Sequence, residues 1–247
     1  MKLGISFFGI IQGPGGRTGS DRDFRHCWPG LEKDLVQPFR DLGHDVKIYF
    51  SGYPFRDPKD EVEFHNMVKP DRVIYSHFAN SDPFTAKFAA FNNFMYEDLD
   101  AVIFTRSDIH FSKIMANENI DFGKFNFLFP EEGWWDSHGF TCDNFYVIPR
   151  RYFRNARDAM EDVYAWPRGK PYVDTHGLIN KLSIISTDIH FISNTPEISD
   201  VNSYYTCCRS GLPEDGRNGY IHPAVRERFG YSWESSSKLV PMKDKTP

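Results

Sequence analysis

Three ionisable side chains of different kinds follow a short apolar run near the middle of the chain. The run is Ala101 to Phe104, and it leads directly into Arg106, Asp108 and His110. In an open α/β sheet, ligands bind beyond the carboxyl ends of the strands. A guanidinium, a carboxylate and an imidazole at such a place can hold a charged ligand, for example a divalent metal that bridges phosphate oxygens. The same residues are also typical of an ion pair at the end of a strand, and the pattern alone is compatible with both.

A glycine-rich segment follows the apolar run at the start of the chain. Residues 12–21 contain four glycines and one proline, a density that does not favour a regular element, so we expect a loop. The backbone N–H groups from Gly13 to Arg17 could cradle a phosphate or a base. The segment has neither the Gly-Lys-Ser/Thr ending of a P-loop nor the fingerprint of a dinucleotide site. The alternative is a flexible surface loop.

A second group of polar and aromatic side chains occupies residues 131–144. This stretch holds four carboxylates, among them Asp136 and Asp143, and the adjacent pair Trp134 and Trp135. Indole rings stack well on sugar rings, and carboxylates accept protons from hydroxyl groups. The stretch therefore favours a sugar-binding or catalytic loop over the alternative, a loop that buried tryptophans hold in place.

The sequence Asp-Ile-His-Phe occurs twice, at residues 108–111 and 188–191. An identity of four residues can arise by chance, but both copies place an aspartate and a histidine two positions apart, where a strand puts them on one face. If the strand that carries His190 lies beside the first copy, we expect His190 to share a metal ion with Asp108.

The elements that must position these residues alternate along the chain. Strands are predicted at residues 2–11, 45–50, 72–76, 101–105, 125–129, 145–148 and 189–193, and helices at residues 31–42, 83–96, 151–164 and 175–182. Strands that alternate with helices predict a single α/β domain, with a mainly parallel central sheet flanked by helices. We place this domain at residues 1–233 and expect residues 234–247 to form a mobile tail.

Composition excludes several classes of protein. The chain has 247 residues, of which 40% are hydrophobic, and a net charge of −5, which argues against a nucleic-acid-binding protein. It has no apolar run of 18 residues, so we expect no transmembrane segment. The four cysteines form no CxxC pair and no disulfide pattern, which favours a reducing, cytoplasmic setting.

The order of these motifs resembles that of the small GT-A-fold glycosyltransferases that build surface polysaccharides in bacteria and large DNA viruses. The resemblance covers roughly residues 1 to 195. Its strongest part is a strand that ends in Arg106-Ser107-Asp108, similar to the family's DxD motif but with one carboxylate missing. The other similar segments are residues 38–53, a helix with Lys87 and Asn92, and residues 143–153.

This resemblance implies a Rossmann-related GT-A domain that moves a sugar from a nucleoside-diphosphate sugar to a glycan hydroxyl. The motif residues Arg106 and Asp108 would contact the donor, and we also expect Gly13, Arg17 and Ser76 near it, because they follow strand ends. Asp108, with His190, would hold Mn²⁺ or Mg²⁺, which stabilises the leaving diphosphate. Because the motif lacks one carboxylate, either another ligand substitutes for it or Arg106 takes over part of the charge neutralisation.

An enzyme that inverts the anomeric centre also needs a base for the acceptor hydroxyl, and Asp143 or Asp136 would serve as that base; the sequence is compatible with both inversion and retention. Trp134 and Trp135 would form the platform for the acceptor sugar. Two other classes stay open at this point. A metal-dependent phosphohydrolase also uses Asp and His at strand ends, and a non-catalytic carbohydrate-binding protein would need only the tryptophans.

Overall fold

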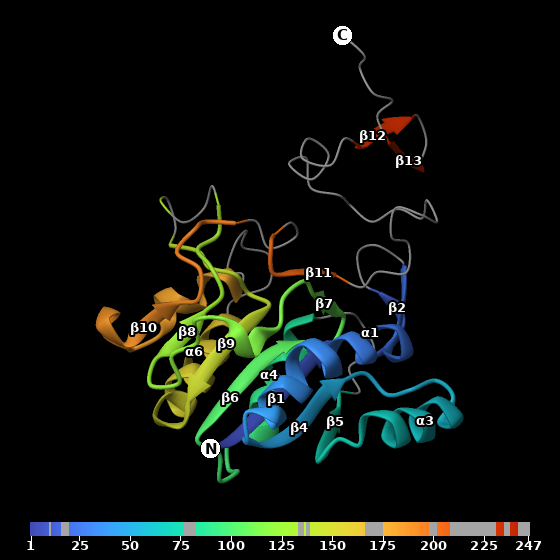
Figure 1. Cartoon of the computed structure of the whole chain (residues 1–247), viewed down its shortest axis with the longest axis horizontal. Helices are drawn as coiled ribbons and strands as arrows, with labels where there is room; N and C mark the ends of the chain where they lie inside the picture. The colour runs from blue at the N-terminus through green and yellow to red at the C-terminus, as the bar shows by residue number, and fades with distance from the viewer. Residues whose placement is uncertain are drawn as a thin grey trace.

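The computed structural model describes residues 1–9, 11–15, 20–76, 83–132, 136, 139–165, 175–197, 202–207, 231–234 and 238–241. Its centre is a seven-stranded sheet with the order β10-β8-β9-β6-β1-β4-β5 (Figure 1). The strands are β1 (Lys2–Gly9), β4 (Asp45–Gly52), β5 (Arg72–Tyr75), β6 (Ala101–Arg106), β8 (Phe125–Phe127), β9 (Phe145–Pro149) and β10 (Ile189–Phe191). Only β9 runs against its neighbours β6 and β8, so the predicted mainly parallel α/β sheet is confirmed.

Helices cover both faces of this sheet (Figure 1). One face packs against a continuous helical stretch, which consists of α1 (Phe24–Leu31), the π-helical turn η2 (Glu32–Val36) and α2 (Gln37–Asp41). The separate helix α3 (Pro58–Val68) packs against the same face. The other face packs against α4 (Pro83–Phe94) and α6 (Phe153–Ala165). Along β1, Ile5 and Phe7 point to the first layer and Phe8 points to the second, as the two-residue period of a strand requires. Burial on both faces explains why the central strands are apolar throughout.

The long helical stretch begins earlier than the sequence predicts. The side chain of Asp23 accepts a hydrogen bond from the backbone N–H of Arg25 at 2.9 Å, which caps α1 at Phe24 rather than at Leu31. At its other end Gly43 has a φ of 82°, the left-handed conformation that ends a helix, as the sequence predicts.

Shorter elements complete the described chain. They are the hairpin β2 (Gln12–Gly15) and β3 (Ser20–Asp23), the ribbon of β7 (Ile109–Phe111) with β11 (Tyr205–Cys207), and the ribbon of β12 (Tyr231–Glu234) with β13 (Lys238–Pro241). The described residues also form four 3₁₀ turns: η3 (Met115–Asn117), η4 (Arg150–Tyr152), η5 (Thr175–Lys181) and η6 (Ser186–Asp188). No helix in these described parts is long and apolar enough to cross a membrane.

Two predicted elements are wrong. The segment expected to be a loop at residues 12–21 forms the paired strands β2 and β3, while residues 16–19 lie outside the described part. The helix expected at residues 175–182 is the 3₁₀ turn η5. In the hairpin, ladder hydrogen bonds outweigh the unfavourable glycine content, because both strands are anchored to the body of the protein by side chains described below.

The carboxyl ends of the parallel strands meet at one edge of the sheet. In the ladder, Phe8 lies opposite Arg106, Gly9 opposite Gly52, and Gly52 opposite Tyr75. Since β9 is antiparallel to β6, it begins at this same edge. The side chains that follow β1, β5 and β6, and those that precede β9, are therefore brought to one side of the molecule.

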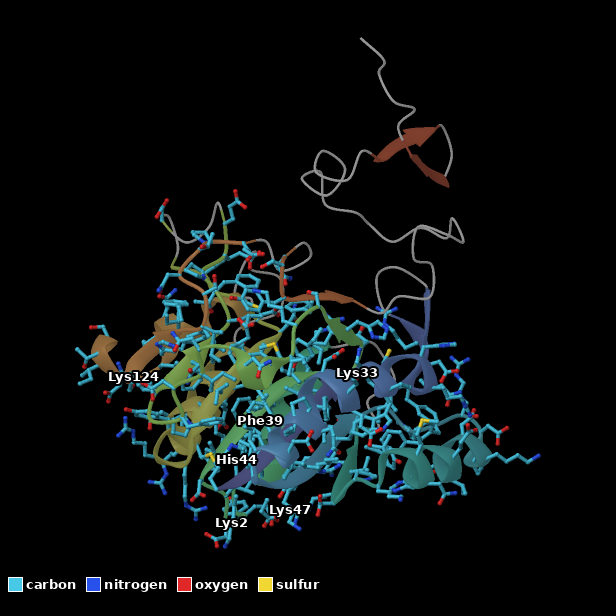
Figure 2. All side chains as sticks on the ribbon, in the orientation of Figure 1. Lys2, Lys33, Phe39, His44, Lys47 and Lys124 are labelled. Atoms are coloured by element: carbon cyan, nitrogen blue, oxygen red, sulfur yellow. The ribbon has the colours of Figure 1, made fainter. Side chains whose placement is uncertain are left out.

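The opposite edge, where β1 and β4 begin, holds a cavity of about 400 Å³. Figure 2 shows Lys2 and Lys47 at this lower edge. Six of its charged side chains form three bridges, from Lys2 to Asp98, from Lys47 to Asp71 and from Arg72 to Glu97. This cavity is therefore lined by ion pairs, and it lies at the edge of the sheet opposite the carboxyl ends of the strands.

Gly52 is expected to tolerate no larger residue at the carboxyl edge. A Cβ at this position would lie 2.6 Å from the backbone oxygen of Gly9, and backbone atoms in paired strands cannot move aside. Gly52→Ala is expected to lower the free energy of unfolding by about 1–3 kcal/mol, measured by denaturant titration. The control is Gly123→Ala, whose new Cβ meets only the carboxylate of Asp121, and which is expected to change stability by less than about 0.5 kcal/mol. Equal effects of the two variants would contradict the predicted clash.

Candidate functional site

Asp108 is the centre of a buried cluster of charges at the carboxyl edge. Its Oδ1 accepts from Nε of Arg106 at 2.7 Å, and its Oδ2 accepts from Nη2 of Arg106 and from Nε of Arg22, both at 2.7 Å. The residue is only 3% exposed. Of the two roles that the sequence allows Arg106, a phosphate contact or a hold on the carboxylate, the structure therefore shows the second.

The two guanidinium groups determine the charge of this carboxyl. Burial alone would raise its pKa, but Arg106 and Arg22 outweigh burial and hold the pKa of Asp108 well below its usual range. Asp108 is thus an anion at neutral pH, and the Arg106 contact is the two-pronged geometry in which a guanidinium binds a carboxylate most strongly.

This donor set does not fit a divalent cation at Asp108. Both carboxylate oxygens already accept from guanidinium groups, and an incoming cation would have to displace at least one of them. A metal site also needs several ligands. Within the residues that the structure describes, no group of three His, Cys, Asp or Glu side chains could hold a metal ion.

His190, predicted to share a metal with Asp108, lies elsewhere. It belongs to β10, which pairs with β8 in the central sheet, whereas residues 109–111 of the first copy form β7, which pairs with β11. Its Nε2 is 2.7 Å from the backbone oxygen of Asn119. The condition for the prediction, that this strand lie beside the first copy of the motif, is not met, so the proposed His190–Asp108 pair is wrong.

His110 also points away from the charge cluster. It lies on β7 against α1, where a Cβ on Gly30 would come within 2.6 Å of its Nδ1. Burial lowers the pKa of the His110 imidazole, an effect that nearby Asp34 opposes and His26 reinforces. His110 is thus packed against the helix, and only Arg106 and Asp108 of the predicted trio are in contact.

A second charged pair lies where β9 begins. The ammonium of Lys87 donates to the backbone oxygen of Asp143 at 2.5 Å and to its carboxylate Oδ2 at 3.0 Å. Lys87 is 3% exposed and lies 4.8 Å from the ring centroid of Phe8, so its charge is buried between α4 and β1. The Asp143 side chain is 17% exposed. Lys87 therefore fixes the position of a carboxylate that still reaches the surface.

The segment around Asp143 is also fixed from the C-terminal side. The hydroxyl of Tyr205, on β11, accepts from the side-chain amide of Asn144 at 2.8 Å and lies 3.4 Å from the sulfur of Cys142. All three side chains are buried, and burial raises the pKa of the Cys142 thiol to about 12. This thiol is therefore a neutral packing group, and Tyr205 positions the residues on both sides of Asp143.

The glycine-rich hairpin is anchored at its base by charged and polar side chains. Gly13 lies opposite Arg22 in the ladder, and Arg22 in turn reaches Asp108. On the other strand, Gln12 donates to the carboxylate of Asp60 at 2.8 Å. Arg25, just beyond the hairpin, also binds Asp60, at 2.6 Å. These contacts bring Gly13 to the same edge as the cluster.

The other predicted site residues fall into two groups. Ser76 is 6% exposed and follows β5 at the carboxyl edge, where its N–H donates to Gly52. Asp136 is exposed. Arg17, Trp134 and Trp135 lie outside the described residues.

Sequence reasoning missed the roles of Arg22 and Lys87. Nothing near Arg22 signals its partner, which lies 86 positions away. Lys87 could have been recognised, because it is a single lysine at helical spacing from Phe91 and Phe94 on an otherwise apolar helix face. A cation inside such a stripe indicates a buried partner.

No protein-family model matches the chain, and no curated protein sequence matches it.

Among solved structures, the chain is similar to the galactosyltransferase LgtC in complex with donor and acceptor sugar analogues, with 9% identity, a TM-score of 0.49, and 77% of this chain and 73% of that chain covered. It is also similar to a Drosophila β-1,4-galactosyltransferase 7 in complex with manganese, UDP-Gal and xylobiose (8% identity, TM-score 0.43, 96% and 82% covered). A third is a glycosyltransferase involved in glycosylation of the major capsid of PBCV-1 (8% identity, TM-score 0.42, 77% and 82% covered). Because so few residues are shared, the reaction of this chain has to be inferred from its own side chains.

Proposed function

We propose that the protein is a glycosyltransferase that moves a sugar from a nucleoside-diphosphate sugar to a hydroxyl group of a glycan. One observation carries this proposal: the carboxyl edge of the sheet combines a guanidinium cluster with a separate, oriented carboxylate. The cluster is Arg22, Arg106 and Asp108, and the carboxylate is Asp143, held by Lys87. Glycosyl transfer needs both parts, because the leaving diphosphate is an anion and the attacking hydroxyl must lose a proton.

The donor is proposed to lie across the ends of β1 and β6. Gly13 and the following residues to Arg17 would face its phosphates, and Ser76 would bound the nucleoside side. In support, the hairpin base and the end of β5 reach the same edge as Asp108, and ligands of open α/β sheets bind at this edge.

Asp143 is proposed as the base, because Lys87 orients its carboxylate and part of that group is exposed. In the transfer, the acceptor oxygen attacks the anomeric carbon and gives its proton to Asp143. The bond from that carbon to the diphosphate oxygen breaks, and the nucleoside diphosphate leaves with the electron pair. Asp136 is the second candidate for the base.

The acceptor site and the cellular location of the reaction are proposed from the sequence. Trp134 and Trp135 are proposed as the platform for the acceptor sugar, since indole faces stack on sugar rings. As the family resemblance implies, we propose a surface polysaccharide as the acceptor. The cysteine pattern supports a cytoplasmic reaction.

Nucleotide sugars are expected to stabilise the full chain against heat. Melting temperatures would be measured with UDP- and GDP-sugars, and with the same sugars without nucleotide. A ligand at 100 times its Kd adds about 2.7 kcal/mol to the free energy of unfolding, which gives a clear shift. Release of nucleoside diphosphate, dependent on an added oligosaccharide, would then be measured with each stabilising donor.

Each outcome of this experiment points to one class. Binding of nucleotide sugars with acceptor-dependent release supports the glycosyltransferase. Stabilisation by free sugars alone would indicate a carbohydrate-binding protein, and release of inorganic phosphate without acceptor would indicate a phosphohydrolase. Either of the last two results would overturn the proposal.

A further inference from the structure

We infer that Arg22 and Arg106, held together by Asp108, bind the donor diphosphate and supply the positive charge that a divalent metal would otherwise provide. This inference rests on the proposed function and assigns a donor contact, Arg22, from outside the strand-end motif. Asp108 becomes a positioning residue for two arginines instead of a metal ligand.

The first step is the state of the carboxylate. Asp108 accepts three hydrogen bonds of 2.7 Å from two guanidinium groups, and its side chain is only 4% exposed. A divalent cation at this carboxylate would be repelled by two cations already in contact with it. The described chain also offers no group of three carboxylate, imidazole or thiol side chains to complete a coordination shell.

The second step is the convergence of the two arginines from separate elements. Arg106 ends β6, and Arg22 comes from β3 in the hairpin that follows β1. Their shared contact to Asp108 places both guanidinium groups where the ends of β1 and β6 meet. Their exposures differ, since the side chain of Arg22 is 6% exposed and that of Arg106 is 26% exposed.

The third step is chemical. A guanidinium is planar, always charged, and presents donors in a fork that matches phosphate oxygens. Such groups can stabilise the charge that develops on a leaving diphosphate, as a bound metal does. With Asp108 holding both arginines in place before the donor arrives, little reorganisation is needed when the charge appears.

The decisive measurement on the wild-type chain is turnover in EDTA and with added Mn²⁺ or Mg²⁺. The rate at which nucleoside diphosphate is released is expected to differ by less than about twofold among the three conditions, because no step requires the metal. The same is expected of the donor Kd. Loss of turnover in EDTA that Mn²⁺ restores would overturn the inference and leave the proposed function intact. No donor binding under any condition would overturn the proposed function itself.

Variants of the arginines test their direct role. Arg106→Lys and Arg22→Lys keep the charge but lose the fork, and each is expected to weaken donor binding by about 10- to 100-fold, the loss of one or two charged hydrogen bonds. Neither loss should be rescued by Mn²⁺. The control is Arg40→Lys, an exposed arginine on α2, which should bind the donor normally.

Melting temperature is recorded for each variant, because Arg22 is buried. Arg106 is more exposed, so Arg106→Lys keeps the test valid if Arg22→Lys fails to fold. A folded Arg106→Lys variant with normal donor affinity would contradict the inference.

Discussion

Asp143→Asn is expected to lower turnover by about 100- to 10,000-fold, the contribution of a positioned general base. Donor affinity should stay nearly unchanged, because the base acts on the acceptor hydroxyl in the transition state. The amide keeps the shape of the side chain and its place beside Lys87, but it cannot take up the proton. The measurements are kcat, donor Kd and melting temperature on the same preparation.

The ion pair with Lys87 affects how this variant is interpreted. Removing the Asp143 charge leaves a buried ammonium with its contact to the backbone oxygen, so some loss of thermal stability is expected whether or not the residue is catalytic. The split between kcat and donor Kd, measured well below the melting temperature, therefore decides the role. If kcat is normal, Asp143 is not the base, and Asp136→Asn becomes the variant to test.

Asp108→Asn is expected to lower both stability and turnover. Breaking a buried ion pair by removing one partner costs about 3–5 kcal/mol, because the other charge stays buried without compensation. Here two guanidinium groups would lose their shared anion. In the fraction that still folds, turnover should fall by about 100-fold or more, since the arginines are no longer held in place.

Unfolding in denaturant and kcat at low temperature measure the two losses. The control is Asp98→Asn, whose bridge to Lys2 is exposed to solvent, so its melting temperature should hardly change. An Asp108→Asn variant as stable and active as the wild type would remove Asp108 from the site.

The effect of pH on stability follows from the direction in which folding shifts the pKa of Asp108. Because the folded state lowers this pKa, the carboxylate stabilises the fold fully above its unfolded pKa of about 3.9, and the stabilisation is lost as pH falls through the lower folded value. The difference in unfolding free energy between wild type and Asp108→Asn should therefore be constant from about pH 5 to 8 and shrink below about pH 4. A difference that grows on acidification would contradict the ion-pair assignment.

The sheet was predictable because its central strands are buried on both faces, while the edge strands β5 and β10 are partly exposed. Residues 101–104 form an apolar run and residues 45–50 alternate between polar and apolar side chains, and both patterns are typical of strands. Helix α3 was missed because only Phe64 and Val68 of its eleven residues are buried, which gives too weak an apolar pattern. Its signals were local, namely the capping Asp57 and a proline at the first position.

The site was only partly predictable for a different reason. Arg106 and Asp108 are two positions apart, so their sequence already suggested contact. Arg22 and Lys87 act across 86 and 56 positions, and only the order of strands in the sheet brings them to Asp108 and Asp143. The same order placed His190 on a distant strand, although its local sequence is identical to that of the first motif.

The hydrogen bond between Tyr205 and Asn144 joins two residues that are synthesised at different times. These residues are 61 positions apart, and β11 is translated after every strand of the central sheet. At an elongation rate of about 5–20 residues per second, that interval lasts about 3 to 12 s. During this time β9 can already pair with β6 on the ribosome, while the turn that carries Asp143 has not yet met the phenol that fixes it. The contact that fixes the carboxylate side of the site therefore depends on a residue that is translated after all seven strands of the central sheet.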